Sequence, residues 1–148
     1  ISAACGMALS AKLSGKSYRT YAIVGDGELQ EGQNWEAAMF AGAKKLDNLV
    51  VFVDANGLQI DGTTDAVLKV EDFEQKFAAF GFATQRIDGH DHQAIENAIK
   101  GITKGMPNSI VLNTVKGKGV SFYEAMGVGV HSTNCTDEQY KMALAELN

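Results

Sequence analysis

The stretch Leu49-Val50-Val51-Phe52-Val53, followed by Asp54, decides the fold class of this sequence. A run of five apolar residues without polar alternation predicts a strand, at 48–53, that is buried on both of its faces. Such a strand is typical of a parallel sheet that carries helices on either side, because both faces of that sheet are covered. The stretch therefore predicts an α/β fold.

Helical and strand-like segments alternate on both sides of this strand. Further strands are predicted at 18–24, 82–87 and 109–114. Helices are predicted at 1–13, 33–46, 71–80, 92–104 and 137–147, the last two with Asp91 and Thr136 as N-caps. Strands that alternate with helices imply a parallel sheet with helices on both faces. No repeat or linker interrupts the pattern, so we expect one domain over residues 1–148.

The bulk properties exclude several classes of protein. A net charge of -5 gives no electrostatic footprint for nucleic-acid binding. No apolar run reaches the roughly eighteen residues that a membrane span needs, so no membrane association is expected. Cys5 and Cys135 fit no metal-binding spacing and are too few for a disulfide framework, which predicts reduced thiols and a cytoplasmic location. The apolar, small-residue start at Ile1 predicts a chain that is incomplete at its N-terminus.

Polar and glycine-rich residues gather where the predicted strands end. In open α/β sheets, ligands bind at the carboxyl ends of the strands. That rule selects four short segments of this sequence, at 25–27, 54–57, 88–91 and 116–119.

Asp26 and Asn56 form the pair with the clearest chemistry. Asp26 lies between two glycines after one strand, and Asn56 follows a second strand thirty residues later. If the strands are parallel neighbours, both side chains lie at the same edge of the sheet. A carboxylate and an amide carbonyl are hard oxygen ligands that suit Mg²⁺, and a diphosphate would supply further oxygens. Gly-Asp-Gly alone would also fit an ordinary turn.

Several separate motifs resemble transketolase, a thiamine-diphosphate enzyme. They are Gly25-Asp26-Gly27-Glu28-Leu29-Gln30-Glu31-Gly32, Trp35-Glu36-Ala37-Ala38, Asn56-Gly57-Leu58-Gln59-Ile60-Asp61-Gly62, Asp88-Gly89-His90-Asp91 and Thr114-Val115-Lys116-Gly117-Lys118-Gly119. The resemblance covers nearly the whole chain and is greatest to the N-terminal subunit of split transketolases. It implies the thiamine-diphosphate-binding fold, with thiamine diphosphate and Mg²⁺ as cofactors.

The resemblance also implies roles for individual residues. The magnesium ligands would be the side chains of Asp26 and Asn56 and the backbone carbonyl of Leu58. The residues that contact the cofactor would be Gly25, Asp26, Gly27, Glu28, Asn56, Leu58 and Ile60. His131 would be the catalytic residue near the substrate, although Val130 and Ser132 depart from the family pattern beside it. Glu31 would belong to an acidic network at a subunit interface.

The function implied is transfer of a two-carbon ketol unit from a ketose phosphate to an aldose phosphate, as in the pentose phosphate pathway. The activating glutamate of such enzymes lies in a pyrimidine-binding domain, so the resemblance implies a dimer or heterotetramer that includes a C-terminal partner subunit. Deoxyxylulose-phosphate synthase, a dehydrogenase E1 component and a catalytically silent cofactor-binding subunit remain alternatives.

Other polar residues have plainer interpretations. His90, His92, Lys116 and Lys118 are expected to be loop or solvated residues, although the two lysines could hold a phosphate. Along the helix 33–46, Trp35, Ala38, Met39 and Ala43 are expected on one side. Trp35, Met39 and Phe40 are interpreted as packing residues of the core or of a subunit interface.

Overall fold

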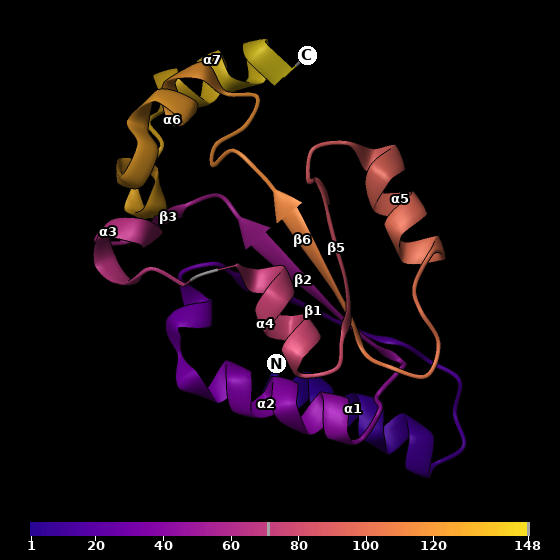
Figure 1. Cartoon of the computed structure of the whole chain (residues 1–148). Coiled ribbons are helices and arrows are strands. Elements are labelled where there is room, and N and C mark those ends of the chain that lie inside the picture. Colours follow the sequence, from indigo (N-terminus) through magenta and orange to yellow (C-terminus); the bar gives the residue numbers. More distant parts are fainter. Residues whose placement is uncertain (71, 148) are drawn as a thin grey trace.

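The computed structural model describes residues 1–70 and 72–147 of the chain. Within these residues, four parallel strands form the main sheet in the order β1-β2-β6-β5 (Figure 1). The strands are β1 (Thr20–Gly25), β2 (Leu49–Ala55), β6 (Asn108–Asn113) and β5 (Ala83–Asp88). Each lies close to a predicted range, and the predicted α/β class is confirmed.

The strand β2 lies inside the sheet, between β1 and β6. Its residues alternate between two layers of the core. Leu49, Val51 and Val53 belong to one buried cluster, and Val50 and Phe52 belong to another on the opposite face. All five side chains are buried, which is the reason that this segment shows no polar alternation.

Helices cover the two faces of the sheet unequally. One face packs against α1 (Ser2–Leu13), α2 (Gly32–Ala43) and α4 (Phe73–Ala79). The opposite face packs against α5 (His92–Lys100), which lies over the β5 side of the sheet (Figure 1). Over β1 this second face leaves Tyr21 and Ile23 exposed. The expected helices on both faces are therefore present.

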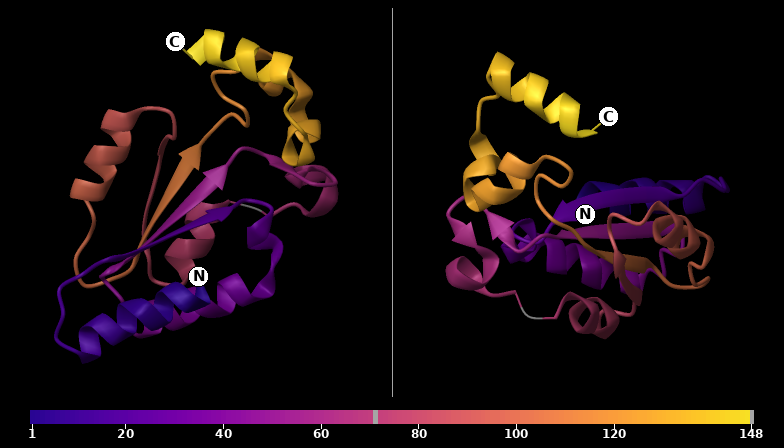
Figure 2. Two further views of the ribbon diagram at one scale, coloured as in Figure 1. Left: turned by 180° about the vertical axis from the view of Figure 1, so that it is seen from behind. Right: turned by 90° about the horizontal axis from the view of Figure 1, so that it is seen from above.

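A helical segment lies beyond the carboxyl ends of β2 and β6 (Figure 2). It consists of α6 (Ser121–Met126), η2 (Gly127–Ser132) and α7 (Asp137–Leu147). A short hairpin of β3 (Leu58–Gln59) and β4 (Gly62–Thr63) also lies at this end, followed by α3 (Thr64–Leu68). The sequence predicted α7 but none of the other elements of this region, nor η1 (Glu28–Gln30).

The predicted N-caps are confirmed. Asp91 accepts hydrogen bonds from the backbone N–H groups of Gln93 and Ala94 at the start of α5. Thr136 and Gln139 exchange hydrogen bonds of 3.2 and 3.0 Å at the start of α7, each side chain accepting from the other's backbone N–H. The helix expected at 71–80 corresponds to α4, and its N-cap is Asp72. Glu71 lies outside the described residues.

The expected orientation of the helix 33–46 was wrong in part. The buried residues of α2 are Asn34, Ala37, Ala38 and Ala41, whereas Met39 is 57% exposed and Ala43 is also exposed. Small side chains face inward because α2 lies very close to its neighbours. The helix also ends at Ala43, three residues early, and Lys45 follows with a φ of 49°.

None of the helices within residues 1–70 and 72–147 combines the length and the apolar character that crossing a membrane requires.

Gly42 marks the closest approach of α2 to the end of α4. A Cβ at this position would lie 1.7 Å from the carbonyl oxygen of Phe80, so Gly42→Ala must push the two helices apart. We expect a loss of at least about 2 kcal/mol in the free energy of unfolding, as for an overpacked core. Urea unfolding checks the value.

Gly6→Ala is the matched control, because a Cβ at Gly6 in α1 meets nothing within 4 Å. Alanine is the better helix former, so this variant should be neutral or more stable by up to about 1 kcal/mol. Equal stabilities of the two variants would contradict the close approach of α2 and α4.

Candidate functional site

Asp26 lies at the point where the loops after β1 and β2 meet. Its backbone N–H donates to the carbonyl of Asp54 over 3.1 Å, which extends the pairing of β1 with β2 by one residue. One carboxylate oxygen accepts the N–H of Gly27 at 2.8 Å, and the other accepts the N–H of Gly57 at 2.6 Å. The residue is only 3% exposed. A single carboxylate therefore holds the two loops together.

Burial raises the pKa of Asp26, and the nearby charge of Asp54 raises it further. The N–H groups of Gly57 and Gly27 oppose this effect, because their hydrogen bonds favour the ionised carboxylate. Ionised Asp26 is thus only partly compensated by the protein. A bound cation would supply the missing compensation.

The loop after β2 presents Asn56 with a fixed side-chain orientation. Its Nδ2 donates to Asp54 Oδ2 over 3.1 Å, and its Oδ1 accepts the backbone N–H of Leu58 at 2.9 Å. Gly57 between them has a φ of 75°, which lets the chain turn sharply without strain. Asn56 and Asp26 consequently lie at the same edge of the sheet, as the parallel register predicts.

A cavity of about 380 Å³ opens at this edge. All eight residues to which the sequence assigned a site role line it: Gly25, Asp26, Gly27, Glu28, Asn56, Leu58, Ile60 and His131. They come from three separate parts of the chain, the β1 loop, the hairpin region and η2. Their roles in binding and catalysis stay predictions.

The same cavity contains residues that the sequence did not assign to the cofactor, metal or catalytic set, namely Asp54, Gln59, Asp61 and Lys116. Asp54 carries a signal that could have found it, since it is an acidic residue directly after a buried strand. Lys116 was expected to be solvated, with phosphate binding as the alternative, and it lines this cavity and the next one.

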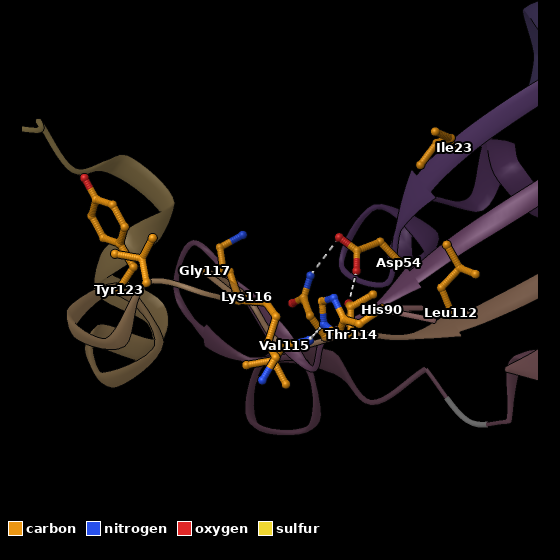
Figure 3. A pocket seen from close by; sticks show the side chains of 12 residues that line it. Ile23, Asp54, His90, Leu112, Thr114, Val115, Lys116, Gly117 and Tyr123 are labelled. Atoms are coloured by element: carbon orange, nitrogen blue, oxygen red, sulfur yellow. Dashed lines mark hydrogen bonds between the residues drawn. The ribbon is translucent and has the colours of Figure 1, made fainter. Parts of the chain in front are cut away.

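A second cavity, of about 640 Å³, adjoins the first and shares Asp54, Asn56 and Lys116 with it (Figure 3). His90 lies in its wall and accepts the N–H of Val115 at 2.8 Å, so it joins two loops. In the same figure, Asp54 extends from the end of β2 toward the labelled Thr114.

Gly27 is required by a close approach within the site. A Cβ at this position would lie 2.9 Å from the Cβ of Gln59 on β3, closer than side chains approach one another. The glycine therefore lets the loop after β1 pack directly against the β3–β4 hairpin, which brings Ile60 to the cavity.

The donor set at this edge fits a magnesium ion with a diphosphate. Asp26 offers carboxylate oxygens, and Asn56 and Leu58 offer carbonyl oxygens, which are the hard ligands that Mg²⁺ takes. Mg²⁺ keeps its remaining positions for water and phosphate, so few protein ligands suffice. Among residues 1–70 and 72–147, no cluster of three or more His, Cys, Asp or Glu side chains suggests a different kind of metal site.

Comparisons with known proteins agree with this geometry. Residues 4–147 match the family described as the thiamine diphosphate binding domain of transketolase. The chain is 47% identical to the 6-deoxy-6-sulfo-D-fructose transketolase subunit SqwG of Clostridium sp., over 99% of the chain and 54% of the relative. It is 39% identical to an apulose-4-phosphate transketolase subunit of Phocaeicola vulgatus, over 100% of the chain and 53% of the relative.

Solved structures show the same fold. A transketolase from Campylobacter jejuni has a TM-score of 0.86 at 29% identity, over 97% of this chain and 24% of that one. A transketolase from Pichia stipitis in complex with sedoheptulose 7-phosphate has a TM-score of 0.88 at 27% identity, over 97% of this chain and 23% of that one.

The chain belongs to the thiamine-diphosphate-binding domain family of transketolases. It spans about half the length of the two curated transketolase subunits.

The pH dependence of stability should reveal the burial of Asp26. Its folded-state pKa lies above the ordinary value of 3.8, so folding favours the protonated form. The stability that this group contributes is fully present below pH 3.8 and is lost as the pH rises through the raised pKa. Without cofactors, we compare the unfolding free energy of the unmodified protein with that of Asp26→Asn. The unmodified value minus the variant value should fall as the pH rises above 3.8.

Asp47→Asn is the control with the opposite sign. The hydrogen bond from Lys12 lowers the pKa of Asp47, so its contribution is present above the ordinary value and is lost as the pH falls. The unfolding free energy of the unmodified protein minus that of Asp47→Asn should therefore rise with pH. The rise should be less than about 1 kcal/mol, because the Lys12–Asp47 pair is partly exposed. Urea titrations at several pH values give both slopes. Slopes of the same sign would show that Asp26 is not buried as described.

Proposed function

We propose that the protein containing this chain is the diphosphate-binding subunit of a split transketolase. It transfers a two-carbon ketol unit from a ketose phosphate to an aldose phosphate, as in the pentose phosphate pathway, using thiamine diphosphate and Mg²⁺. The proposal rests on one observation. Asp26 and Asn56 line the same cavity, and the chain belongs to the family of transketolase thiamine-diphosphate-binding domains. The names of the two curated relatives, both described as transketolase subunits, support the split organisation.

The buried end of the cavity is proposed to hold the diphosphate. Asp26, Asn56 and the carbonyl of Leu58 would bind Mg²⁺, and Gly25, Gly27 and Glu28 would contact the cofactor. Ile60 is 65% exposed and lines the cavity, so it would give the thiazolium ring an apolar surface. When bound, thiamine diphosphate supplies the carbon that accepts and releases the two-carbon unit.

His131 is proposed to move protons at the sugar hydroxyl groups. It lies in η2, is exposed, and reaches the cavity that also contains Asp26 and Ile60. An imidazole changes its charge near neutral pH, which suits a general acid or base. The structure of a relative with sedoheptulose 7-phosphate supports sugar phosphates as the substrate class.

A partner subunit with the pyrimidine-binding domain is proposed to complete the enzyme. Exposed apolar side chains on α1 and α2 support an interface there, since Met7 and Met39 are more than half exposed and Phe40 is 39% exposed. Glu31 at the start of α2 is exposed as well. Contiguous exposed apolar surface marks interaction sites. We propose a heterotetramer of two copies of each subunit, located in the cytoplasm.

The magnesium anchor is tested by cofactor binding. Asp26→Ala should abolish binding of thiamine diphosphate with Mg²⁺, because it removes the charged ligand and the bonds to both loops. Asn56→Ala should weaken binding through the same ion. Calorimetric titration of the assembled protein measures both. Asp88→Ala is the control, since it removes a strand-end carboxylate that lies outside the cavity. Unchanged affinity in Asp26→Ala would overturn the assignment.

The role of His131 is tested by turnover. In the assembled enzyme, His131→Ala should lower the rate of two-carbon transfer by about 10²–10⁴-fold, with nearly unchanged cofactor affinity. His92→Ala, an exposed histidine on α5, should keep full turnover. Transfer should appear only when the full-length subunit is mixed with its partner. A His131→Ala enzyme with undiminished turnover would make His131 a loop residue.

A further inference from the structure

Asp54 contacts two of the three proposed magnesium ligands, Asp26 and Asn56. It lies near the end of β2, paired with Gly25 of β1 on one side and with Leu112 of β6 on the other. Its backbone carbonyl accepts the N–H of Asp26 at 3.1 Å, and its Oδ2 accepts the Nδ2 of Asn56 at 3.1 Å. One residue thus holds the backbone of the first ligand and the side chain of the second.

The contacts of Asn56 permit one orientation of its amide group. An ionised carboxylate only accepts hydrogen bonds, so the group facing Asp54 must be the NH₂. The backbone N–H of Leu58 only donates, so the group facing it must be the oxygen. A reversed amide would place an NH₂ against an N–H and an oxygen against a carboxylate. The orientation of the carbonyl oxygen that a metal ion needs is therefore fixed by Asp54 together with the backbone N–H of Leu58.

Asp54 is itself fixed by Thr114, the residue that follows β6. The hydroxyl of Thr114 donates to Asp54 Oδ1, across sixty residues of sequence. Both oxygens of the Asp54 carboxylate are then engaged, one by Thr114 and one by Asn56. Figure 3 shows these two bonds as dashed lines that converge on Asp54.

Thr114 lines the 640 Å³ cavity and not the 380 Å³ cavity that contains the proposed magnesium ligands. Its hydroxyl reaches Asn56 through Asp54. A change at Thr114 can therefore test the hydrogen-bond chain without altering any residue that lines the cofactor cavity.

We propose that Thr114 and Asp54 are positioning residues, which hold the Asn56 amide with its oxygen directed to the magnesium ion of the bound cofactor. The proposal rests on the proposed function of the cavity. Hydrogen bonds behind metal ligands typically change metal affinity by about 10–100-fold, because they remove the cost of orienting the ligand at binding. Thr114→Val keeps the shape of the side chain and removes the donor, so it should weaken binding of thiamine diphosphate with Mg²⁺ by about tenfold or more.

The test compares four variants of the full-length protein with its partner: Thr114→Val, Thr114→Ser, Asn56→Ala and the double variant Thr114→Val with Asn56→Ala. Calorimetry measures the affinity for thiamine diphosphate at a fixed Mg²⁺ concentration, and urea unfolding confirms that each variant folds. Thr114→Ser retains the hydroxyl and should bind within about twofold of the unmodified protein. In the Asn56→Ala background, Thr114→Val should have no further effect, because residues that act through one another are not additive.

Each outcome decides one point. An unmodified protein that binds no thiamine diphosphate with Mg²⁺ would overturn the proposed function. If it binds and Thr114→Val binds equally well, the positioning role is wrong while the proposed function stands. A Thr114→Val effect of the same size with and without Asn56 would also overturn the positioning role, because Thr114 would then act by another route.

Discussion

The arrangement of the site depends on one buried carboxylate. Asp26 is removed from solvent, where its charge is disfavoured, and two backbone N–H groups offset only part of that cost. The bond from the Gly57 N–H fixes the loop after β2 against the loop after β1. The charge of a buried carboxylate in this state can be neutralised either by a proton or by a bound cation. The proposed magnesium ion is such a cation, and the neighbouring carbonyl oxygens of Asn56 and Leu58 suit it.

Other constraints follow from keeping these loops together. Gly27 must be small because β3 packs against it, and Gly57 must adopt a positive φ so that its N–H reaches Asp26. The cavity consequently has a buried, hydrogen-bonded end at Asp26 and an exposed end at Ile60 and His131. This division agrees with the proposal that the chain anchors the diphosphate while a partner completes the reactive end.

Local patterns predicted the strands and the helix caps, because both depend on residues near in sequence. They predicted the buried side of α2 only in part, since Ala38 is buried but Met39 is exposed. Its buried side carries small residues, and Gly42 on the same helix lies close to the backbone of Phe80. The elements between β6 and α7 were also missed, since Gly127-Val128-Gly129-Val130 carries no clear helical or strand period.

The sequence by itself determined that Asp26 and Asn56 share an edge of the sheet. Each follows a strand directly, and parallel strands place their carboxyl ends together. Only the tertiary structure placed β6 beside β2, and with it Thr114 beside Asp54. The family resemblance predicted a site role for His131, and the tertiary structure brought it into the same cavity. The physical reason is that these contacts join residues far apart in the chain, and the packing of side chains between whole elements selects them, not the preference of any local segment.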